Sequence, residues 1–430
     1  MTIPRKRIED IQHIGFISTR LSGNDGVSLE AEKWANVLED LGYFCYYFAG
    51  ELDHPPERSF LSPKAHFQYQ EIREINEFVF RNTIRTTEIS DKIESLKKEL
   101  LHDIHDFVTR FHIDLLIVEN AFAIPMNIPL GLALTEFVAV TGIPTVAHNH
   151  DFYWERKRFS VNCVWDYLNT AFPPRHPFIR QVVINSEARM QVALRRGGAA
   201  IIIPNIMDFE NPLPLRDDYT ADVRHSLGIG EKEFFILQPT RVVQRKGIEH
   251  SIELVRRLKE RGVEAVLVIS HASGDEGSGY ELRLREFSGL LDVKVHFVSD
   301  IIGTKRGRTE DGRKIYSLFD VYPYADLVTY PSNYEGFGNA FLEAIYFKKP
   351  VMINNYSIYT HDIKPKGFKV IEIDDYIRDD NVDSIIGLMK NPDTRDEMVE
   401  YNYELGRRFY SYSNLRRQLK FIISDFFGEN

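Results

Sequence analysis

The sequence contains little cysteine. Only Cys45 and Cys163 occur among its 430 residues. Two cysteines cannot build a disulfide framework, and no CxxC pair or Cys/His cluster has the spacing of a zinc site. We interpret both as small apolar core residues and expect a reducing, cytoplasmic location for the protein.

Long apolar runs and an excess of basic residues are also missing. No stretch approaches the roughly 18 apolar residues that a membrane-spanning helix needs, and the start, MTIPRKRIED, lacks the apolar segment of a secretory signal. We therefore expect neither export nor stable membrane insertion. The formal net charge is −10, so a nucleic-acid partner is not expected, because such proteins carry a basic footprint. A phosphate ligand would need locally concentrated cations.

What is present is an alternation of short β-rich segments with amphipathic helical segments. The nearly continuous apolar character of the β segments is typical of parallel strands buried on both faces. In the first half, strands are expected at 13–18, 44–50, 115–120, 145–150, 181–186 and 199–205. In the second half, they are expected at 234–240, 264–270, 293–299, 326–332, 349–355 and 369–373. The two series predict an α/β protein with two doubly wound, Rossmann-like sheets.

The segment 204–219 contains three prolines and divides the two series. We expect one domain at 1–205, a second at 206–412 and a terminal amphipathic helix at 413–430. The polar helical segment at about 51–112 looks like an insertion in the first domain. Because open α/β sheets bind ligands at the carboxyl ends of their strands, two such domains would leave a ligand-binding cleft there.

The strongest chemical signal is PSNYEGFGNAFLEAIYFKKP at 331–350. Glu335 and Glu343 stand eight residues apart, with glycines between them and a helix expected from Asn339. The first N–H groups and the dipole of that helix suit a diphosphate. A carboxylate on either side of it would accept hydrogen bonds from sugar or ribose hydroxyls. The alternative is a pair of solvated glutamates beside an ordinary turn.

A second signal is LQPTRVVQRKGIEHS at 237–251. Arg241 and Lys246 lie in a loop between a strand and a helix, where two cations suit a diphosphate leaving group. They would stabilise charge that develops as a glycosidic bond breaks. The alternative is a solvated basic loop. Arg245 is expected to face solvent.

These two motifs resemble those of retaining glycosyltransferases of family 4. Such enzymes have the GT-B fold, in which two Rossmann-like doubly wound domains face each other across a cleft. The resemblance covers nearly the whole chain, and its most specific marks are the E-x7-E and Arg-x4-Lys elements. It implies that the N-terminal domain serves the acceptor, that the C-terminal domain binds the nucleotide-sugar donor, and that the terminal helix returns to the N-terminal domain.

The resemblance also assigns roles to the residues of the two motifs. Glu335 would contact the donor sugar hydroxyls, Glu343 would bind the ribose, and Arg241 and Lys246 would hold the diphosphate. Further donor-binding positions are Gly336, Phe337, Gly338, Asn339, Ala340 and Leu342.

The N-terminal half carries weaker marks of the same family. The loop RLSGNDGVSLEAEKW at 20–34 stands where family members have a glycine-rich loop, but Asn24 and Asp25 interrupt the usual double glycine. Gly26 is expected near the donor phosphate, and Asn24 is expected on the acceptor side. A glycine-containing turn is weak evidence when taken alone.

A histidine motif follows the strand expected at 145–150. PTVAHNHD at 144–151 resembles the family pattern P-x-V-x-T-x-H-D and puts His150 and Asp151 in the family positions, with His148 replacing the usual threonine. The resemblance implies that His150 hydrogen-bonds the donor sugar or the leaving phosphate. The alternative for both histidines is a satisfied core residue.

Two basic stretches are candidates for the acceptor side. Arg156 and Arg158 follow Asp151 in DFYWERKRF, and a glycine-rich stretch at 304–314, expected to be mobile, carries further cations. Either stretch would bind a phosphate or carboxylate of the acceptor, and Asp151 joins them as an acceptor-side candidate. The alternative for each stretch is a solvated charged face.

The expected reaction is transfer of a hexose, glucose or mannose, from a UDP- or GDP-linked donor to a soluble, anionic small molecule. No residue stands out as a covalent nucleophile. Because the resemblance implies that the anomeric configuration is retained, the acceptor would attack from the face that the nucleotide leaves, and the leaving phosphate would take the acceptor's proton. Neither a metal nor a further cofactor is expected.

Other readings of the sequence stay open at this point. They are a glycan phosphorylase of the same fold that uses a sugar phosphate, a sugar-nucleotide epimerase, and a non-catalytic sugar-nucleotide-binding protein. The donor base, the acceptor, the linkage and the oligomeric state, including whether an oligomer forms, are not specified by these motifs.

Overall fold

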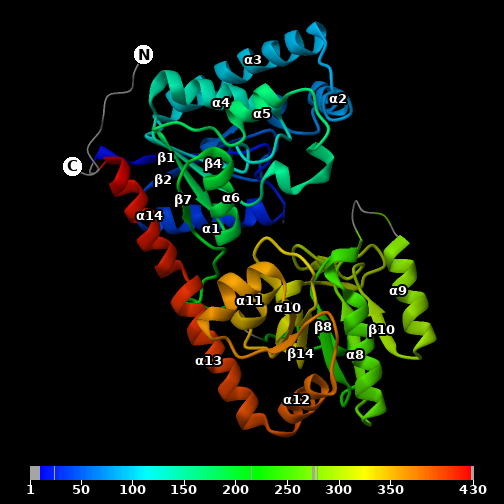
Figure 1. Cartoon of the computed structure of the whole chain (residues 1–430). Coiled ribbons are helices and arrows are strands. Elements are labelled where there is room, and N and C mark those ends of the chain that lie inside the picture. The colour runs from blue at the N-terminus through cyan, green and yellow to red at the C-terminus, as the bar shows by residue number, and fades with distance from the viewer. Residues whose placement is uncertain (1–9, 24, 215, 274–276, 278, 428–430) are drawn as a thin grey trace. The chain divides into compact units, whose positions relative to one another are not determined.

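The computed structural model describes residues 10–23, 25–214, 216–273, 277 and 279–427. The chain divides into two compact units, one formed by residues 1–206 with 412–430 and one by residues 207–411 (Figure 1). Among the described residues, no helix has both the length and the apolar character to cross a membrane.

Unit 1, the first of these, is built on a seven-stranded parallel sheet with the order β3-β2-β1-β4-β5-β6-β7. Its strands are β1 (His13–Ile17), β2 (Phe44–Ala49), β3 (Ser59–Leu61), β4 (Leu115–Glu119), β5 (Thr145–Asn149), β6 (Ile179–Val183) and β7 (Ala200–Ile202). Its helices are α1 (Gly26–Asp40), α2 (Gln70–Val79), α3 (Thr87–Phe111), α4 (Ile128–Thr141), α5 (Trp165–Ala171), α6 (Ser186–Arg196) and α14 (Tyr412–Phe427).

Both faces of this sheet are covered, which explains the continuous apolar runs of its strands. Ile14 and Phe16 of β1 pack with α1 and α14. On the opposite face, Ile17 packs with α3 and α4, which lie side by side (Figure 1). Gly15 also faces α3, because a Cβ there would stand 2.8 Å from the Phe107 ring. The close approach of α3 therefore requires glycine at this position.

The terminal helix α14 is part of the core of unit 1. Its buried residues Leu415, Leu419, Ile422 and Ile423 share one apolar cluster with Trp34 of α1. The helix lies against α1 (Figure 1), and Arg416 reaches Asp40 at the end of α1 (3.1 Å). The last segment of the chain thus packs with the first helix.

Unit 2, residues 207–411, is built on a six-stranded parallel sheet with the order β10-β9-β8-β14-β15-β16. Its strands are β8 (Phe234–Gln238), β9 (Ala265–Ile269), β10 (Lys294–Phe297), β14 (Leu327–Tyr330), β15 (Val351–Asn354) and β16 (Ile371–Ile373). Its helices are α7 (Val223–Ser226), α8 (Ile248–Glu260), α9 (Gly279–Leu290), α10 (Leu318–Val321), α11 (Asn339–Tyr346), α12 (Asp379–Lys390) and α13 (Pro392–Tyr410).

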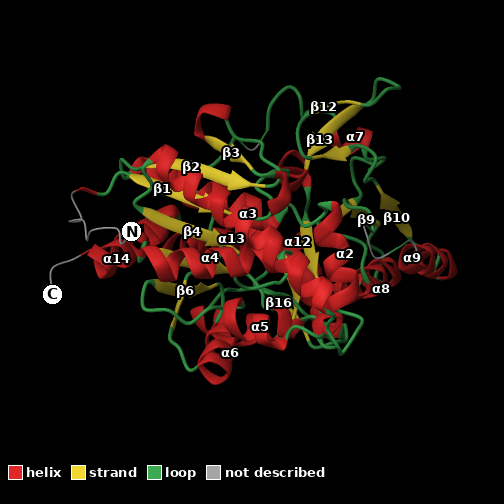
Figure 2. Cartoon of the chain, turned by 90° about the horizontal axis from the view of Figure 1, so that it is seen from above, coloured by secondary structure: helices red, strands yellow, loops and turns green. Residues whose placement is uncertain are grey.

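Every strand expected from the sequence is present, but the structure adds elements that apolar patterning did not reveal. β3 extends the first sheet within the segment regarded as an insertion. A small sheet of β11 (Ile302–Gly303), β12 (Gly307–Arg308) and β13 (Lys314–Ser317) occupies the basic stretch of unit 2, where β12 and β13 run antiparallel beside α7 (Figure 2). The stretch 304–314, which was expected to be mobile, thus contains β12 and the start of β13.

In both sheets the strand that comes first in the sequence lies in the interior of the sheet. One of its neighbours is the next strand in the sequence, and the other neighbour comes later in the chain. β1 lies between β2 and β4, and β8 lies between β9 and β14. The connections that leave the first strand and its neighbour go to opposite faces at such a switch point, and a crevice opens at the carboxyl ends of the strands. The loops after β4 and β5 in unit 1, and after β8 and β14 in unit 2, carry most of the candidate residues.

Replacing Leu419 with alanine tests how strongly unit 1 depends on α14. Leu419 is 2% exposed, and truncation of a buried leucine costs about 2–5 kcal/mol. We expect the denaturant-induced unfolding transition of unit 1 to lose that amount of free energy. Phe421→Ala, on the same helix but 62% exposed, is the matched control and should change it by less than about 0.5 kcal/mol. Equal effects of the two substitutions would contradict the packing described here.

Candidate active site

The loop after β8 places Lys246 beside the carboxyl end of the neighbouring strand β14. The loop ends in a 3₁₀ turn, η6 (Gln244–Lys246), and α8 starts after Gly247. Gly247 has φ +58°, and a Cβ there would stand 2.4 Å from the carbonyl oxygen of Pro331. The two loops therefore approach closely at this glycine, and the amide of Asn333 in the β14 loop donates to the carbonyl oxygen of Arg245 (2.9 Å). Lys246 is therefore buried, with its ammonium 5.4 Å from the ring centroid of Tyr330.

The two strongest motifs of the sequence meet here, although 89 residues separate them. The ammonium of Lys246 donates a short hydrogen bond to Oε1 of Glu335. Arg245 donates to Glu335 Oε2 (3.2 Å) and to the carbonyl oxygen of Tyr334 (3.1 Å). The expectation that Arg245 faces solvent is thus wrong, because its side chain is only 37% exposed and holds this carboxylate.

The charges around Glu335 keep it ionised. Burial of the side chain opposes ionisation, but Lys246 and Arg245 outweigh burial and lower the pKa of Glu335. Burial also lowers the pKa of Lys246. A carboxylate held in this way accepts hydrogen bonds and donates none, which suits the hydroxyl groups of a sugar.

Arg241 lies in the same loop and is exposed. No described side chain pairs with its guanidinium, in contrast to the bound Arg245. Its charge reaches the carboxyl end of β9, where burial, Arg241 and Lys246 together lower the pKa of His271. Arg241 and Lys246 therefore give this edge of the sheet a positive field, and the Arg241 guanidinium remains available for an anion.

The helix α11 begins directly after the glycines of the E-x7-E motif. Gly338 has φ +125°, and a Cβ there would clash with the Tyr356 hydroxyl at 2.4 Å. That hydroxyl donates to the carbonyl oxygen of Phe337 (2.8 Å) and fixes the turn. The amide of Leu342 donates to the carbonyl oxygen of Gly338 (3.1 Å), and a diphosphate would be bound by N–H groups of the turn before it, such as that of Ala340. The structure buries the side chains of Phe337 and Leu342.

Glu343 lies one turn into α11 and is half-buried. The hydroxyl of Tyr322 donates to its Oε2 (2.7 Å). This contact orients the carboxylate from the side of Tyr322. Gly336, between Glu335 and the helix, is also half-buried.

In unit 1, the ends of β4 and β5 form a buried triad of Glu119, His148 and His150. Nδ1 of His148 lies 3.0 Å from Oε2 of Glu119, and Nε2 of His150 lies 3.2 Å from the same oxygen. His148 stacks on Trp34 with ring centroids 4.1 Å apart. Glu119 was not identified from the sequence. The available signal was its position as the last residue of a strand that neighbours β1 at the switch point.

A second network lies beside the triad. Asn120 follows β4 with φ +59°, a strained conformation for a residue other than glycine. Its side chain accepts from the amide of His150 (3.1 Å) and donates to Asp151 (3.0 Å). Asp151 accepts from Nε of Arg156 (2.7 Å). Four polar residues that follow β4 and β5 are thereby tied together.

The remaining candidates of unit 1 are Arg158 and Asn24 on the acceptor side and Gly26 on the donor side. Arg158 donates to the Met126 sulfur (2.9 Å) and lies over the Phe159 ring (4.6 Å). Gly26 is the first residue of α1 and follows the cap Asp25, which accepts from the amides of Val27 and Ser28. Asn24 lies outside the described residues.

The basic stretch at 304–314 is largely neutralised by acidic partners. Arg306 pairs with Asp217 and Asp320, and Arg313 pairs with Asp300 and Asp311. Lys314 pairs with Asp222 at the start of α7 (2.9 Å). These ion pairs hold the small sheet to unit 2, so the stretch is a weaker candidate for acceptor binding than Arg156.

Among the described residues, one group of three has ligand atoms close enough together to raise the question of a metal. It is the Glu119 triad, whose atoms lie within 4.8 Å of one another. Its contacts of 3.0–3.2 Å are hydrogen-bond distances. Each imidazole can donate one N–H to the carboxylate. We therefore assign the group as a hydrogen-bonded triad.

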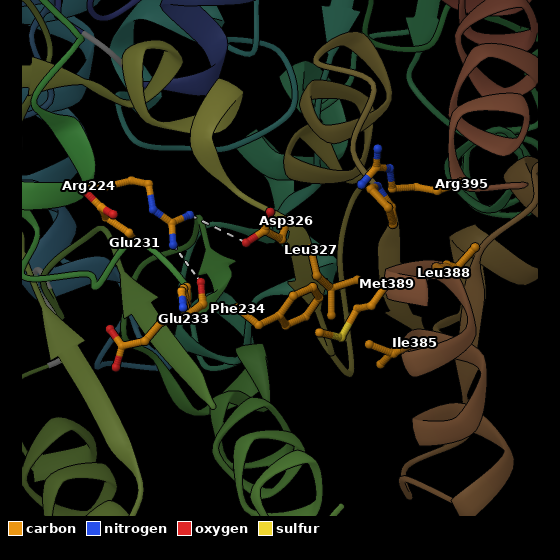
Figure 3. A pocket seen from close by; sticks show the side chains of 12 residues that line it. Arg224, Glu231, Glu233, Phe234, Asp326, Leu327, Ile385, Leu388, Met389 and Arg395 are labelled. Carbon is orange, nitrogen blue, oxygen red and sulfur yellow. Dashed lines mark hydrogen bonds and ion pairs between the residues drawn. The ribbon is translucent and has the colours of Figure 1, made fainter. Parts of the chain in front are cut away.

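A separate cavity of about 270 Å³ lies at the amino ends of β8 and β14. Figure 3 shows Phe234 and Leu327 directed toward Met389, with Arg224 and Asp326 beside them. Arg224 is held by Asp326 (3.6 Å) and by the carbonyl oxygen of Glu233 (2.6 Å). Because Lys246 and Glu335 lie at the carboxyl ends of the same strands, this cavity is not part of the candidate active site.

Comparison with known proteins matches residues 220–405 to the family "Glycosyl transferases group 1". A mannosylglucosylglycerate synthase of Petrotoga mobilis is 34% identical over 84% of this chain and 86% of its own length. A protein of the same name from Thermotoga maritima is 32% identical over 94% of this chain and 97% of its own length. The crystal structure of a glycosyltransferase from Rickettsia africae superposes with a TM-score of 0.67 at 13% identity, covering 98% of this chain and 100% of that one.

These comparisons confirm the GT-B fold and the resemblance drawn from the two motifs. The relatives that match almost the whole chain are synthases, and the matching family is one of transferases. The transferase interpretation therefore holds over those of phosphorylase, epimerase and non-catalytic binding protein. The chain belongs to the group 1 glycosyl transferases, the retaining glycosyltransferases of family 4, which take their sugar from a nucleotide-linked donor.

Proposed function

We propose that the protein transfers a mannosyl group from a nucleoside diphosphate mannose to glucosylglycerate, with retention of the anomeric configuration. The observation that carries this proposal is the match to two mannosylglucosylglycerate synthases over 84% and 94% of the chain. The acceptor in this proposal carries a carboxylate. It agrees with the small anionic acceptor expected from the basic residues of unit 1.

The donor side of the proposal rests on the Lys246–Glu335 pair. Glu335 would accept hydrogen bonds from hydroxyl groups of the donor sugar, and Glu343 would do so from the ribose. Arg241, Lys246 and the first turn of α11 would hold the diphosphate. Because Arg241 is exposed and has no charged partner among the described side chains, it would close on the diphosphate without breaking an ion pair.

The acceptor side rests on Arg156. Its side chain is 43% exposed and is oriented by Asp151, which Asn120 holds in turn. A guanidinium held on one edge presents its other N–H groups in fixed directions, which suits a carboxylate. Arg158 already contacts Met126 and Phe159, so Arg156 is the stronger candidate for the glycerate carboxylate.

The proposed reaction needs no covalent intermediate with the protein. The bond between the anomeric carbon and the diphosphate oxygen breaks, and the acceptor hydroxyl oxygen bonds to that carbon on the same face. The leaving phosphate takes the hydroxyl proton. The protein contributes orientation and stabilisation of the charge that develops on the leaving group.

The proposal also includes the domain roles, the absence of a cofactor and the location that were expected from the sequence. The unit of residues 1–205 would serve the acceptor, and residues 206–412 would bind the donor. The nucleotide sugar would be a co-substrate, with no metal or further cofactor. A cytoplasmic location fits the two free cysteines, Cys45 and Cys163.

The test begins with thermal shifts in UDP, GDP and ADP and in their sugar conjugates. A ligand at about 100 times its Kd adds about 2.7 kcal/mol of stability, which moves Tm by a few degrees. The responding nucleotide is then supplied as its mannose conjugate with glucosylglycerate, and NMR identifies the linkage and anomeric configuration of the product. A response only to sugar phosphates, or product from glycerate and not from glucosylglycerate, would overturn the proposal.

Lys246→Ala tests the diphosphate site. We expect kcat to fall roughly 10²–10³-fold, because one lost contact to developing charge costs about 2.7–4 kcal/mol, and nucleoside diphosphate binding to weaken. The matched control is Lys259→Ala on α8, whose side chain is 54% exposed and pairs with Asp292. Initial rates and calorimetric binding of the nucleotide are measured for both variants. Normal turnover by Lys246→Ala would remove this lysine from the proposal.

Arg156→Ala tests the acceptor site. We expect the KM for glucosylglycerate to rise by roughly 10–100-fold, because a hydrogen bond to a charged group contributes about 1.5–3 kcal/mol, while the donor KM stays unchanged. Transfer to glucosylglycerol, which lacks the carboxylate, should not change. Arg58→Ala removes another arginine of unit 1 that is paired with a carboxylate and 41% exposed, and it should have no effect. An unchanged acceptor KM in Arg156→Ala would count against the assignment.

A further inference from the structure

Glu119 is a fully buried carboxylate whose side chain contacts no lysine or arginine among the described residues. Its side chain is 0% exposed, and the described partners of its two oxygens are the rings of His148 and His150. A buried carboxylate without a counter-charge is costly. One of the two histidines must therefore be a positively charged imidazolium, which balances the negative charge of Glu119.

The surroundings of the two rings decide which one is charged. His148 is 1% exposed, stacks on Trp34 and gives Nδ1 to Glu119, while its Nε2 is buried without a hydrogen-bond partner. An imidazolium would leave a charged N–H unpaired at that nitrogen, so His148 is the neutral ring. Burial, together with the charge of His150, accordingly lowers the pKa of His148 against the opposing effect of Glu119.

His150 has the opposite balance. Its side chain keeps 10% exposure. Burial acts to lower the pKa of His150, but the hydrogen bond to Glu119 and the negative charges of Glu119, Glu30 and Asp151 raise it overall. These acidic groups lie on β4, on α1 and on the segment that follows β5. The other ring that faces His150 is His148, at a centroid distance of 4.4 Å.

We propose that Glu119 is a positioning residue for the transfer reaction: it binds Nε2 of His150 and so directs Nδ1 of that ring to the substrate. Nδ1 accepts from or donates to none of the described residues. His150 is the family histidine, so this inference rests on the proposed function. Its content is the assignment of the buried glutamate, which neither the motif nor the comparisons identify.

The hydrogen bond to Glu119 decides what His150 presents to a substrate in its protonated and in its neutral form. With Nε2–H donated to Glu119, the protonated ring presents Nδ1–H outward as a charged donor, which suits a leaving phosphate or a sugar oxygen. The neutral ring that keeps the Glu119 bond has a bare Nδ1, which repels a phosphate oxygen. Transfer should therefore be lost as the pH rises through the raised pKa of His150.

Glu119→Gln removes the charge and keeps the size of the side chain. We expect the descending limb of the pH profile of kcat/KM to move to lower pH by roughly one to three units, the usual effect of losing a neighbouring opposite charge. At a pH below both limbs, the rates of the variant and the wild type should converge. Glu74→Gln, the same change at an exposed ion pair with Lys92, is the control and should leave the profile in place.

Two outcomes would overturn the role of Glu119. One is a loss of rate by the same factor at every pH, with an unmoved limb, as a purely structural defect would give. The other is a titration of the wild-type protein, monitored by ¹H–¹⁵N correlation spectra of the imidazoles, in which His150 has a pKa at or below the ordinary value of 6.5. The second measurement needs no variant, so it decides the question even if Glu119→Gln does not fold.

The same spectra separate this inference from the proposed function. A raised His150 pKa that falls in Glu119→Gln, in a protein that shows no transfer to glucosylglycerate, would support the triad and refute the acceptor. Transfer that proceeds with an unshifted His150 pKa would do the reverse. Stoichiometric metal in the purified protein, with transfer abolished by a chelator, would overturn the assignment as a hydrogen-bonded triad.

Discussion

The arrangement of the candidate site depends on where each sheet reverses its strand order. β1 and β8 are the first strands of their sheets, and each lies between neighbours reached by connections on opposite faces. The loops after these strands diverge, which exposes the carboxyl ends of the inner strands to ligand. Lys246 follows β8 and Glu335 follows β14, while Glu119 ends β4 and His150 follows β5.

Each unit has a buried carboxylate at the carboxyl ends of its strands, and the groups that balance its negative charge differ between the two units. In unit 2, Glu335 is held by Lys246 and by Arg245, whose guanidinium stays charged at any pH near neutrality. In unit 1, the described side-chain partners of Glu119 are two imidazoles. The guanidinium of Arg245 therefore balances Glu335 independently of pH near neutrality, while the balance at Glu119 depends on the protonation of an imidazole. The charge around Glu335 is in this sense fixed, and the charge around Glu119 changes with pH.

The sequence predicted the large sheets well because strands buried on both faces leave an unmistakable apolar run. It missed β3 and the small sheet around β12, whose strands are short and half-exposed or exposed. The donor motif was recognisable because Glu335 and Lys246 lie in local patterns with glycines at the turns. Glu119 was not recognisable, because its role depends on contacts with two histidines that lie 29 and 31 residues further along the chain. The pairing of Arg245 with Glu335 likewise depends on a contact between loops that no local pattern contains.

The contribution of α14 to unit 1 has a consequence for how the protein is made. Residues 412–427 supply buried leucine and isoleucine side chains to the cluster that contains Trp34, yet residues 207–411 form the other unit and are translated in between. At roughly 5–20 residues per second, the ribosome spends roughly 10–40 s on that interval. Throughout it, the nascent α1 and its side of the first sheet lack their final partner. The N-terminal unit is thus the first to be synthesised and the last to be completed.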